Sequence, residues 1–187
     1  MAGSGGRLRS SIPNQITVAR LACVPVVMFF ILWDSEVGRI VGVVLFLLAA
    51  ASDAVDGYLA RSFRQTSVFG QYADPIADKL LIVGALVCFV ELGELAAAWV
   101  MVIIAREFLV TGLRILAISE GQVIAASPLG KVKAVSHVVL VLAILVGRTF
   151  PVGAWLGVAK DVALALALAL TVVSGVEYFV RCRGLFA

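Results

Sequence analysis

Long apolar stretches fill most of the chain, and short polar or glycine-containing connections separate them. A run of about 20 apolar residues is long enough to cross a bilayer as a helix. The pattern therefore predicts an all-α polytopic membrane protein with six transmembrane helices and no soluble module. We expect one domain over residues 1–187, with residues 1–12 as a short N-terminal segment. The expected helices are Ile16–Trp33, Val37–Phe63, Gln71–Glu91, Leu95–Ile118, Leu129–Gly147 and Ala154–Val180.

The composition indicates that lipid, rather than water, is the solvent of this fold. Of the 187 residues 62% are hydrophobic and 14% are charged, and the mean hydropathy is +1.09. Soluble domains are nearer half apolar, with about a quarter of their residues charged. The three cysteines are far apart, show no metal-ligand spacing and are expected to be small buried apolar side chains. They are Cys23, Cys88 and Cys182.

The distribution of basic residues predicts the orientation of the chain, because cytoplasmic segments of membrane proteins are enriched in Lys and Arg. This enrichment also explains the net charge of +3, so we expect no nucleic acid as a partner. With the N-terminus inside, the cytoplasmic segments hold Arg7, Arg9, Arg61, Arg64, Arg114, Lys131, Lys133, Arg181 and Arg183. The outer segments hold only Arg39, Arg148 and Lys160.

Aromatic residues at the helix ends agree with this orientation. They form two sets that fit the belts seen at membrane interfaces: Trp33, Trp99 and Trp155 outside, and Tyr58, Tyr72 and Tyr178 inside. We therefore expect a multi-pass protein of a bacterial inner (plasma) membrane, with both termini in the cytoplasm.

Acidic residues gather where the second predicted helix ends and the third begins. Asp53 and Asp56 are three residues apart and Asp74 and Asp78 are four apart, so each pair shares a helical face. The short connection Ser62–Gly70 makes the two helices antiparallel neighbours, which lets the four carboxylates converge. Two divalent cations would cancel their charge, and oxygen ligands favour Mg²⁺ or Mn²⁺ over zinc. Such a pair of metal ions is typical of phosphoryl transfer.

Small residues lie beside these acids. Gly57 and Ala60 on the second helix and Gly70 at the start of the third leave room for a nucleotide to approach the backbone closely. Helix packing or a turn would explain the glycines equally simply.

A basic cluster follows in the fourth and fifth helices. Arg106 and Arg114 are eight residues apart and share a face, and Lys131 and Lys133 open the next helix. An arginine pair suits bidentate phosphate binding. Two structural alternatives remain: Lys133 could extend to the membrane interface as an anchor, and Arg106 could form an ion pair with Glu107.

The acidic segment resembles the signature of a known family at every defined position. It reads Asp53-Ala-Val-Asp56-Gly57-Tyr-Leu-Ala60-Arg61, then eight residues, then Gly70-Gln-Tyr-Ala-Asp74-Pro-Ile-Ala-Asp78. This is the pattern of the CDP-alcohol phosphotransferases. The resemblance implies a six-helix membrane fold that forms homodimers, and a reaction in which an alcohol displaces CMP from a CDP-linked substrate.

The same resemblance assigns roles to residues. The four aspartates would hold the two metal ions, and Asp78 would be the general base on the attacking hydroxyl. The residues expected along the CDP moiety are Gly57, Ala60, Arg61 and Gly70.

The basic segment narrows the resemblance to the bacterial phosphatidylglycerophosphate synthases within that family. It is carried by Ile104-Ala-Arg106-Glu-Phe-Leu-Val-Thr-Gly-Leu-Arg114 and Gly130-Lys131-Val-Lys133. The likeness implies that CDP-diacylglycerol and glycerol 3-phosphate react in a cavity facing the cytoplasm, giving phosphatidylglycerol phosphate and CMP. It implies that the acceptor's phosphate binds Arg106, Arg114 and Lys131.

Two alternatives to this function stay open. The same chemistry could serve another acceptor, in cardiolipin, phosphatidylserine or phosphatidylinositol phosphate synthesis, although serine has no phosphate to occupy the basic pocket. A cation transporter could use the aspartates as an ion path, but transport favours ionisable groups spread through the membrane depth. We expect His137 to be structural and assign no role to Glu177.

Overall fold

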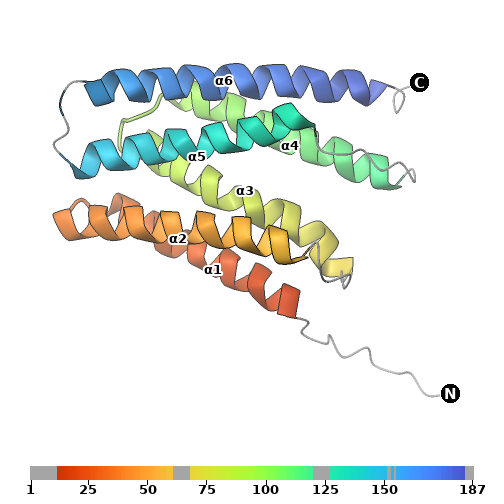
Figure 1. The fold of residues 1–187 in the computed structure, drawn as a ribbon, viewed down its shortest axis with the longest axis horizontal. Helices are drawn as coiled ribbons and strands as arrows, with labels where there is room; N and C mark the ends of the chain where they lie inside the picture. The colour runs from red at the N-terminus through yellow and green to blue at the C-terminus, as the bar shows by residue number, and fades with distance from the viewer. Residues whose placement is uncertain (1–11, 61–67, 120–126, 151–152, 154, 184–187) are drawn as a thin grey trace.

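The computed structural model describes residues 12–60, 68–119, 127–150, 153 and 155–183. The side chains of residues 12–20, 53–60, 68–78 and 118 are outside that description. The described part contains six helices and no strand: α1 (Ile12–Leu32), α2 (Glu36–Ala60), α3 (Val68–Glu91), α4 (Ala97–Ser119), α5 (Pro128–Thr149) and α6 (Trp155–Arg181). Successive helices run in alternating directions, so α1 begins and α6 ends at the same end of the bundle (Figure 1).

The observed helices agree with the predicted ones in number, order and approximate bounds. The largest difference is at α1, which begins at Ile12 rather than Ile16. Pro13 lies in the first turn of α1, where the N–H that proline lacks has no partner within the helix. Residues 61–63, which the pattern included in the second helix, are outside the described part.

Local sequence explains two of the helix ends. Gly93 has a φ of 72°, a left-handed conformation that glycine adopts without strain, and it follows α3. The next amide, Glu94 N–H, donates back to the carbonyl of Phe89 at 2.8 Å, which closes the helix. Ser127 precedes α5, and its Oγ accepts from the N–H of Gly130 at 3.0 Å.

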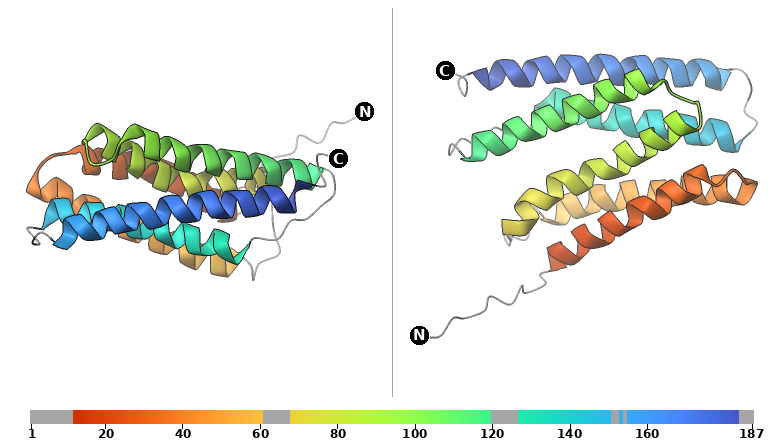
Figure 2. Two further views of the ribbon diagram at one scale, coloured as in Figure 1. Left: turned by 90° about the horizontal axis from the view of Figure 1, so that it is seen from above. Right: turned by 180° about the vertical axis from the view of Figure 1, so that it is seen from behind.

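The six helices close into a ring. Around it the contacts follow the order α1, α2, α5, α6, α4, α3, and α3 returns to α1. Helices that are distant in the chain therefore lie side by side, as α4 and α6 do in the views of Figure 2. The main apolar core includes Phe46, Phe89, Ile103, Leu140 and Ala167.

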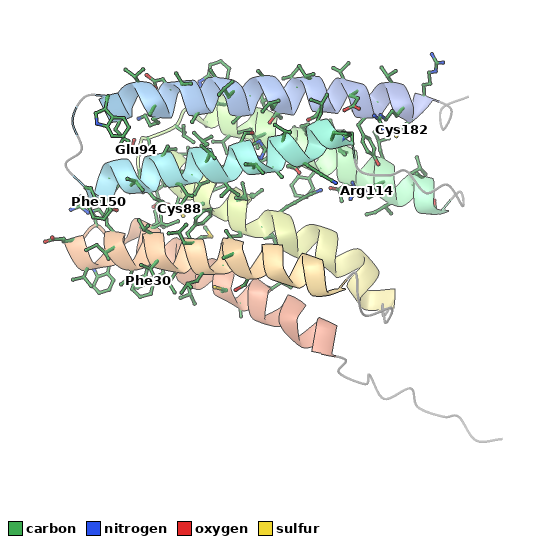
Figure 3. All side chains as sticks on the ribbon, viewed as in Figure 1. Phe30, Cys88, Glu94, Arg114, Phe150 and Cys182 are labelled. Carbon is green, nitrogen blue, oxygen red and sulfur yellow. The ribbon has the colours of Figure 1, made fainter. Side chains whose placement is uncertain are left out.

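The surface of the bundle is apolar. Phe29, Leu48, Phe108 and Val135 are each at least 60% exposed, and side chains project outward along α6 (Figure 3). Such large exposed apolar areas suit lipid rather than water. Among the described residues, α5 and α6 are long and apolar enough to cross a membrane, and Leu21–Leu32 in α1 is a shorter apolar stretch.

The structure tests the exposure of the aromatic residues predicted to lie at the membrane interfaces. Trp33, Trp99 and Trp155 are about half exposed or more, which is compatible with an interfacial belt, and their place in the membrane stays a prediction. Tyr178 is only 3% exposed, so the prediction that it belongs to an inner belt is wrong. It packs into the bundle because α4 covers the face of α6 that carries it.

The cysteines agree with their expected structural role. Cys88 and Cys182 are buried, Cys23 is partly buried, and all three are free thiols.

Candidate active site

The predicted metal ligands lie on two helices that are in contact. Asp53 and Asp56 are in the last third of α2, and Asp74 and Asp78 are in the first half of α3. Both helix ends lie at one end of the bundle (Figure 1). The four side chains are outside the described part, so their convergence stays a prediction. Among the described side chains, no group of three or more His, Cys, Asp or Glu could hold a metal ion.

The residues predicted to lie along the CDP moiety are near the same two helix ends. Gly57 and Ala60 are in the last turns of α2, and Gly70 is in the first turn of α3. Arg61 is outside the described residues. The interaction of these four residues with a nucleotide stays a prediction.

A cavity of about 350 Å³ lies between α3, α4, α5 and α6. The basic side chains that line it come from three helices and are Lys79, Arg106, Arg114, Lys131 and Lys133. The structure therefore brings together the three residues predicted to bind a phosphate, Arg106, Arg114 and Lys131. It adds Lys79, which directly follows Asp78 in the chain and so links the acidic signature to the basic cavity.

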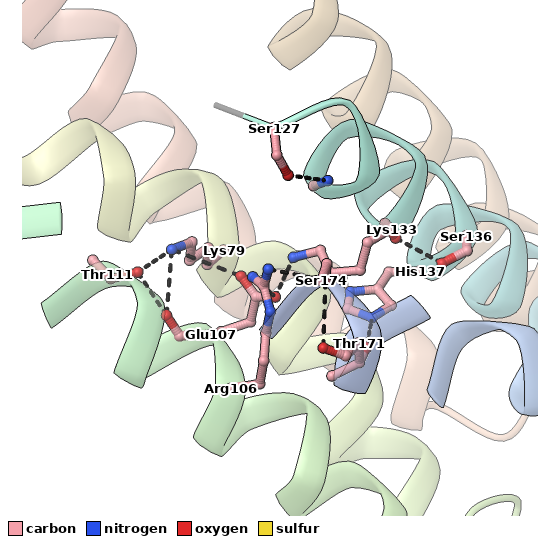
Figure 4. A network of polar contacts seen from close by, with 11 residues as sticks. Lys79, Arg106, Glu107, Thr111, Ser127, Lys133, Ser136, His137, Thr171 and Ser174 are labelled. Atoms are coloured by element: carbon pink, nitrogen blue, oxygen red, sulfur yellow. Dashed lines mark hydrogen bonds and ion pairs between the residues drawn. The ribbon is translucent and has the colours of Figure 1, made fainter. Parts of the chain in front are cut away.

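One carboxylate, that of Glu107, lies among these cations and is buried. Its Oε1 pairs with Nζ of Lys133 and lies 3.4 Å from Nη1 of Arg106. Its Oε2 lies 3.7 Å from Nζ of Lys79 (Figure 4). Because Lys79, Glu107 and Lys133 belong to α3, α4 and α5, this carboxylate joins three helices around the cavity.

The structure decides between the alternatives left for the basic cluster. Lys133 is 6% exposed and paired with Glu107, so its proposed role as an interfacial anchor is wrong. The pair between Arg106 and Glu107 exists, but Lys133 is the closer partner of the carboxylate. Lys79 also donates to Oγ1 of Thr111, and that hydroxyl donates to the carbonyl of Glu107 at 2.6 Å.

Helix α6 holds Arg106 from the other side. Nη2 of Arg106 donates to Oγ of Ser174 at 3.0 Å. The next residue is Gly175, where an added Cβ would lie 3.2 Å from Cγ of Arg106. The absence of a side chain at Gly175 therefore lets the arginine lie close against α6.

The single histidine fits its predicted structural role. His137 is buried, and its Nε2 lies 2.9 Å from Oγ1 of Thr171. Ser174 donates to the carbonyl of Thr171 at 3.3 Å, which continues this polar contact along α6.

The sequence analysis missed Thr171 and Ser174 of α6 near the cavity, and it placed Tyr178 at the membrane interface instead. Thr171, Ser174 and Tyr178 are spaced by three and four residues, so they share one face of an otherwise apolar helix. Polar residues at this spacing in an apolar helix could have been used to predict which face of the helix points into the bundle. Glu177, which had no assigned role, pairs with Arg181 one turn later.

The electrostatics of the cavity favour an anion. Five basic side chains and one described carboxylate line this cavity, which is partly open to solvent. Uncompensated like charges repel strongly where the dielectric constant is low. Guanidinium and ammonium groups gathered in this way suit the doubly charged oxygens of a phosphate.

Comparisons with known proteins show which proteins this chain resembles. The chain is similar to the CDP-diacylglycerol–glycerol-3-phosphate 3-phosphatidyltransferase of Bacillus subtilis, with 41% identity over 90% of this chain and 93% of the relative. The protein of that name from Rickettsia bellii is 31% identical over 96% of this chain and 99% of the relative. A probable phosphatidylglycerophosphate synthase of Mycobacterium tuberculosis is 38% identical over 94% of this chain and 84% of the relative. Because the family model for CDP-alcohol phosphatidyltransferases matches residues 10–173, which include both clusters, the chain belongs to that family.

Proposed function

We propose that this protein transfers the phosphatidyl group of CDP-diacylglycerol to glycerol 3-phosphate, giving phosphatidylglycerol phosphate and CMP. The observation that carries the proposal is the cavity with five basic side chains and one carboxylate. The phosphate of glycerol 3-phosphate supplies the anion that this excess of positive charge favours. The names of the three relatives support the same donor and acceptor.

The residues of the cavity bind and orient the acceptor. Arg106, Arg114 and Lys131 hold its phosphate, and Glu107 keeps Lys133 and its neighbours in place. Holding the acceptor at one end directs its free primary hydroxyl toward the start of α3, which lowers the entropic part of the barrier.

The reaction exchanges one phosphate ester for another. The acceptor's hydroxyl oxygen attacks the phosphorus that carries diacylglycerol, and the bond from that phosphorus to CMP breaks. Asp78 takes the hydroxyl proton as the general base. No covalent intermediate with the protein is needed, because CMP is itself a competent leaving group.

The four aspartates fit a pair of divalent cations. Asp53, Asp56, Asp74 and Asp78 offer only hard oxygen ligands, and they lie on two helices in contact, which suits Mg²⁺ or Mn²⁺. When bound, such ions stabilise charge on the attacking and leaving oxygens. Along the CDP moiety we place Gly57, Ala60, Arg61 and Gly70.

The proposal also includes the membrane topology of the protein and its assembly. All six helices span a bacterial inner membrane, with both termini and the active site on the cytoplasmic side. Residues 1–187 form one catalytic domain that assembles as a homodimer, and the lipid tails enter between helices from the bilayer. The exposed apolar side chains support this arrangement, as does the inward position of Glu107 in the middle of α4.

Acceptor profiling tests the function directly. Purified protein with CDP-diacylglycerol and Mg²⁺ should release CMP with glycerol 3-phosphate, and not with serine, an inositol phosphate or phosphatidylglycerol. Preferential use of one of the other alcohols would replace the proposed acceptor. Cation flux into protein-containing vesicles without CMP release would instead favour the transporter.

Removal of one predicted metal ligand tests the chemistry. Asp78→Asn should lose most CMP release because both a ligand and the proton acceptor are gone, and EDTA should abolish activity of the unchanged protein. Asp161→Asn is a matched control, since Asp161 is exposed near the opposite end of the bundle and should tolerate the change. Full activity of Asp78→Asn, or full activity in EDTA, would contradict the metal assignment.

A further inference from the structure

Tyr178 is the one tyrosine whose side chain the structure describes, and it is buried beside the basic cavity. It lies near the end of α6, is 3% exposed and lines the cavity together with Arg106 and Arg114. Its ring packs with Val110 and Leu113 of α4. Within the described part of the chain, its hydroxyl has no hydrogen-bond partner.

A buried hydroxyl without a partner is costly, and each such group in a folded protein calls for an explanation. Phenylalanine would fill the same space at Tyr178 and avoid that cost. The apolar packing of the ring therefore accounts for an aromatic residue at this position but does not account for its oxygen. A ligand that enters the cavity would account for the oxygen.

The neighbours of Tyr178 indicate what such a ligand offers. Nε of Arg106 and Nε of Arg114 are also buried without partners among the described residues, and both side chains line the same cavity. A guanidinium N–H can only donate, and a phenol at neutral pH donates readily. Three donors without described partners beside one cavity suit a ligand rich in acceptor oxygens, as a phosphate is.

Two other hydroxyls on the same face of α6 provide a contrast. Thr171 is paired with His137, and Ser174 accepts from Arg106 and donates to a backbone carbonyl. Those two hydroxyls are satisfied inside the protein. Along this face only the hydroxyl of Tyr178, the residue that lines the cavity, is left without a described partner.

We propose that Tyr178 is a further binding residue for the acceptor alcohol, and that its hydroxyl donates a hydrogen bond to a phosphate oxygen of glycerol 3-phosphate. This inference rests on the proposed function and adds α6 to the helices that bind the acceptor. This hydrogen bond would orient the phosphate without adding a further positive charge to a cavity already rich in cations. It thereby favours an acceptor that ends in a phosphate over one that does not.

The test is Tyr178→Phe, which removes one oxygen and leaves the packing intact. The KM for glycerol 3-phosphate should rise about tenfold, since one hydrogen bond to a charged group is lost, and the KM for CDP-diacylglycerol should not change. The melting temperature without ligand should stay the same or rise, because the lost hydroxyl has no partner among the described residues. Stabilisation of the purified protein by glycerol 3-phosphate or by inorganic phosphate should be weaker in the variant.

Thr171→Val is the matched control. It also removes a buried hydroxyl from the same face of α6, but from a residue bonded within the protein. It should lower the melting temperature and leave the ratio of the two KM values unchanged.

Three results would overturn the role of Tyr178: an unchanged KM for glycerol 3-phosphate in Tyr178→Phe, an equal rise of both KM values, or equal stabilisation of variant and unchanged protein by inorganic phosphate. The last measurement needs no turnover. If the unchanged protein did not use glycerol 3-phosphate, the proposed function would fail, and the phosphate measurement would still decide on Tyr178.

Discussion

Two clusters of charged residues lie at different levels of the bundle, and each is built around a carboxylate. Glu107, in the middle of α4, lies among the basic side chains of the cavity of about 350 Å³. Glu94, in the connection between α3 and α4, lies 3.4 Å from Nη1 of Arg148 and 3.1 Å from Nζ of Lys160, beside a cavity of about 230 Å³. We refer to them as the inner cluster and the outer cluster.

Among the described side chains, the two clusters differ in how far their charges cancel. In the outer cluster the two basic residues share Glu94, and Arg148 has a second carboxylate in Asp34 at 3.6 Å. In the inner cluster five basic side chains face the single described carboxylate of Glu107.

This difference separates a structural role from a binding role. In the outer cluster Arg148 and Lys160 are both paired with carboxylates, and partial exposure makes each pair weak. The neighbouring Arg39 donates to the carbonyl of Arg148 at 3.0 Å, and its Nε is buried without a partner among the described residues. The inner cluster keeps cations and unused donors that an incoming anion would satisfy. Residue types alone would not have distinguished them, because both combine Lys, Arg and Glu.

The largest expected effect concerns the side of the membrane on which each cluster lies. Labelling of a single cysteine near each cluster should give an all-or-none result. After replacement of the native cysteines by serine, Ala96→Cys near the outer cluster should react with an impermeant thiol reagent in intact cells. Ser119→Cys at the end of α4 should react only after the inner face is made accessible. Both positions are exposed. The reverse pattern would place the basic cavity outside, away from substrates made in the cytoplasm.

Removal of the two central carboxylates should give the next largest difference. Glu107→Gln leaves Lys79, Arg106 and Lys133 without their shared partner and should destabilise the protein by about 3–5 kcal/mol. Glu94→Gln breaks partly exposed pairs and should cost only about 0.2–1 kcal/mol. Thermal unfolding in detergent measures both effects.

Glycerol 3-phosphate should restore part of the stability lost in Glu107→Gln, because its phosphate brings an anion to the same cations. Glycerol 3-phosphate should not restore the stability lost in Glu94→Gln. Equal destabilisation of the two variants, with no response to the ligand, would remove the distinction between the clusters.

Removal of one arginine from each cluster should have a smaller but selective effect. Arg114→Ala should raise the KM for glycerol 3-phosphate roughly ten- to hundredfold and leave the KM for CDP-diacylglycerol nearly unchanged, since one charged hydrogen-bonding partner is lost. Arg148→Ala should change neither KM and should lower the melting temperature slightly. If Arg114→Ala moved both KM values equally, Arg114 would be an anchor rather than a phosphate ligand.

Much of this protein could be predicted from local patterns in the sequence. Span-length apolar runs predicted the six helices, and the glycine-containing connections predicted between them include the one with Gly93. The spacing of Arg106 and Arg114 placed both on one face of α4, and the structure finds them in one cavity. These features depend on the period and length of a single helix, which residues close in sequence determine.

The sequence by itself therefore determined the helices, the faces that carry charge and the family signature. The tertiary structure decided which faces meet, because the ring order places α5 beside α2 and α6 beside α4. That packing buries Lys133 against Glu107, although its position near a helix end resembles that of an interfacial anchor. It also turns Tyr178 away from the membrane surface and into the lining of the cavity. Neither outcome can be read from one helix, because the exposure of a side chain depends on residues that the neighbouring helices bring from elsewhere in the chain.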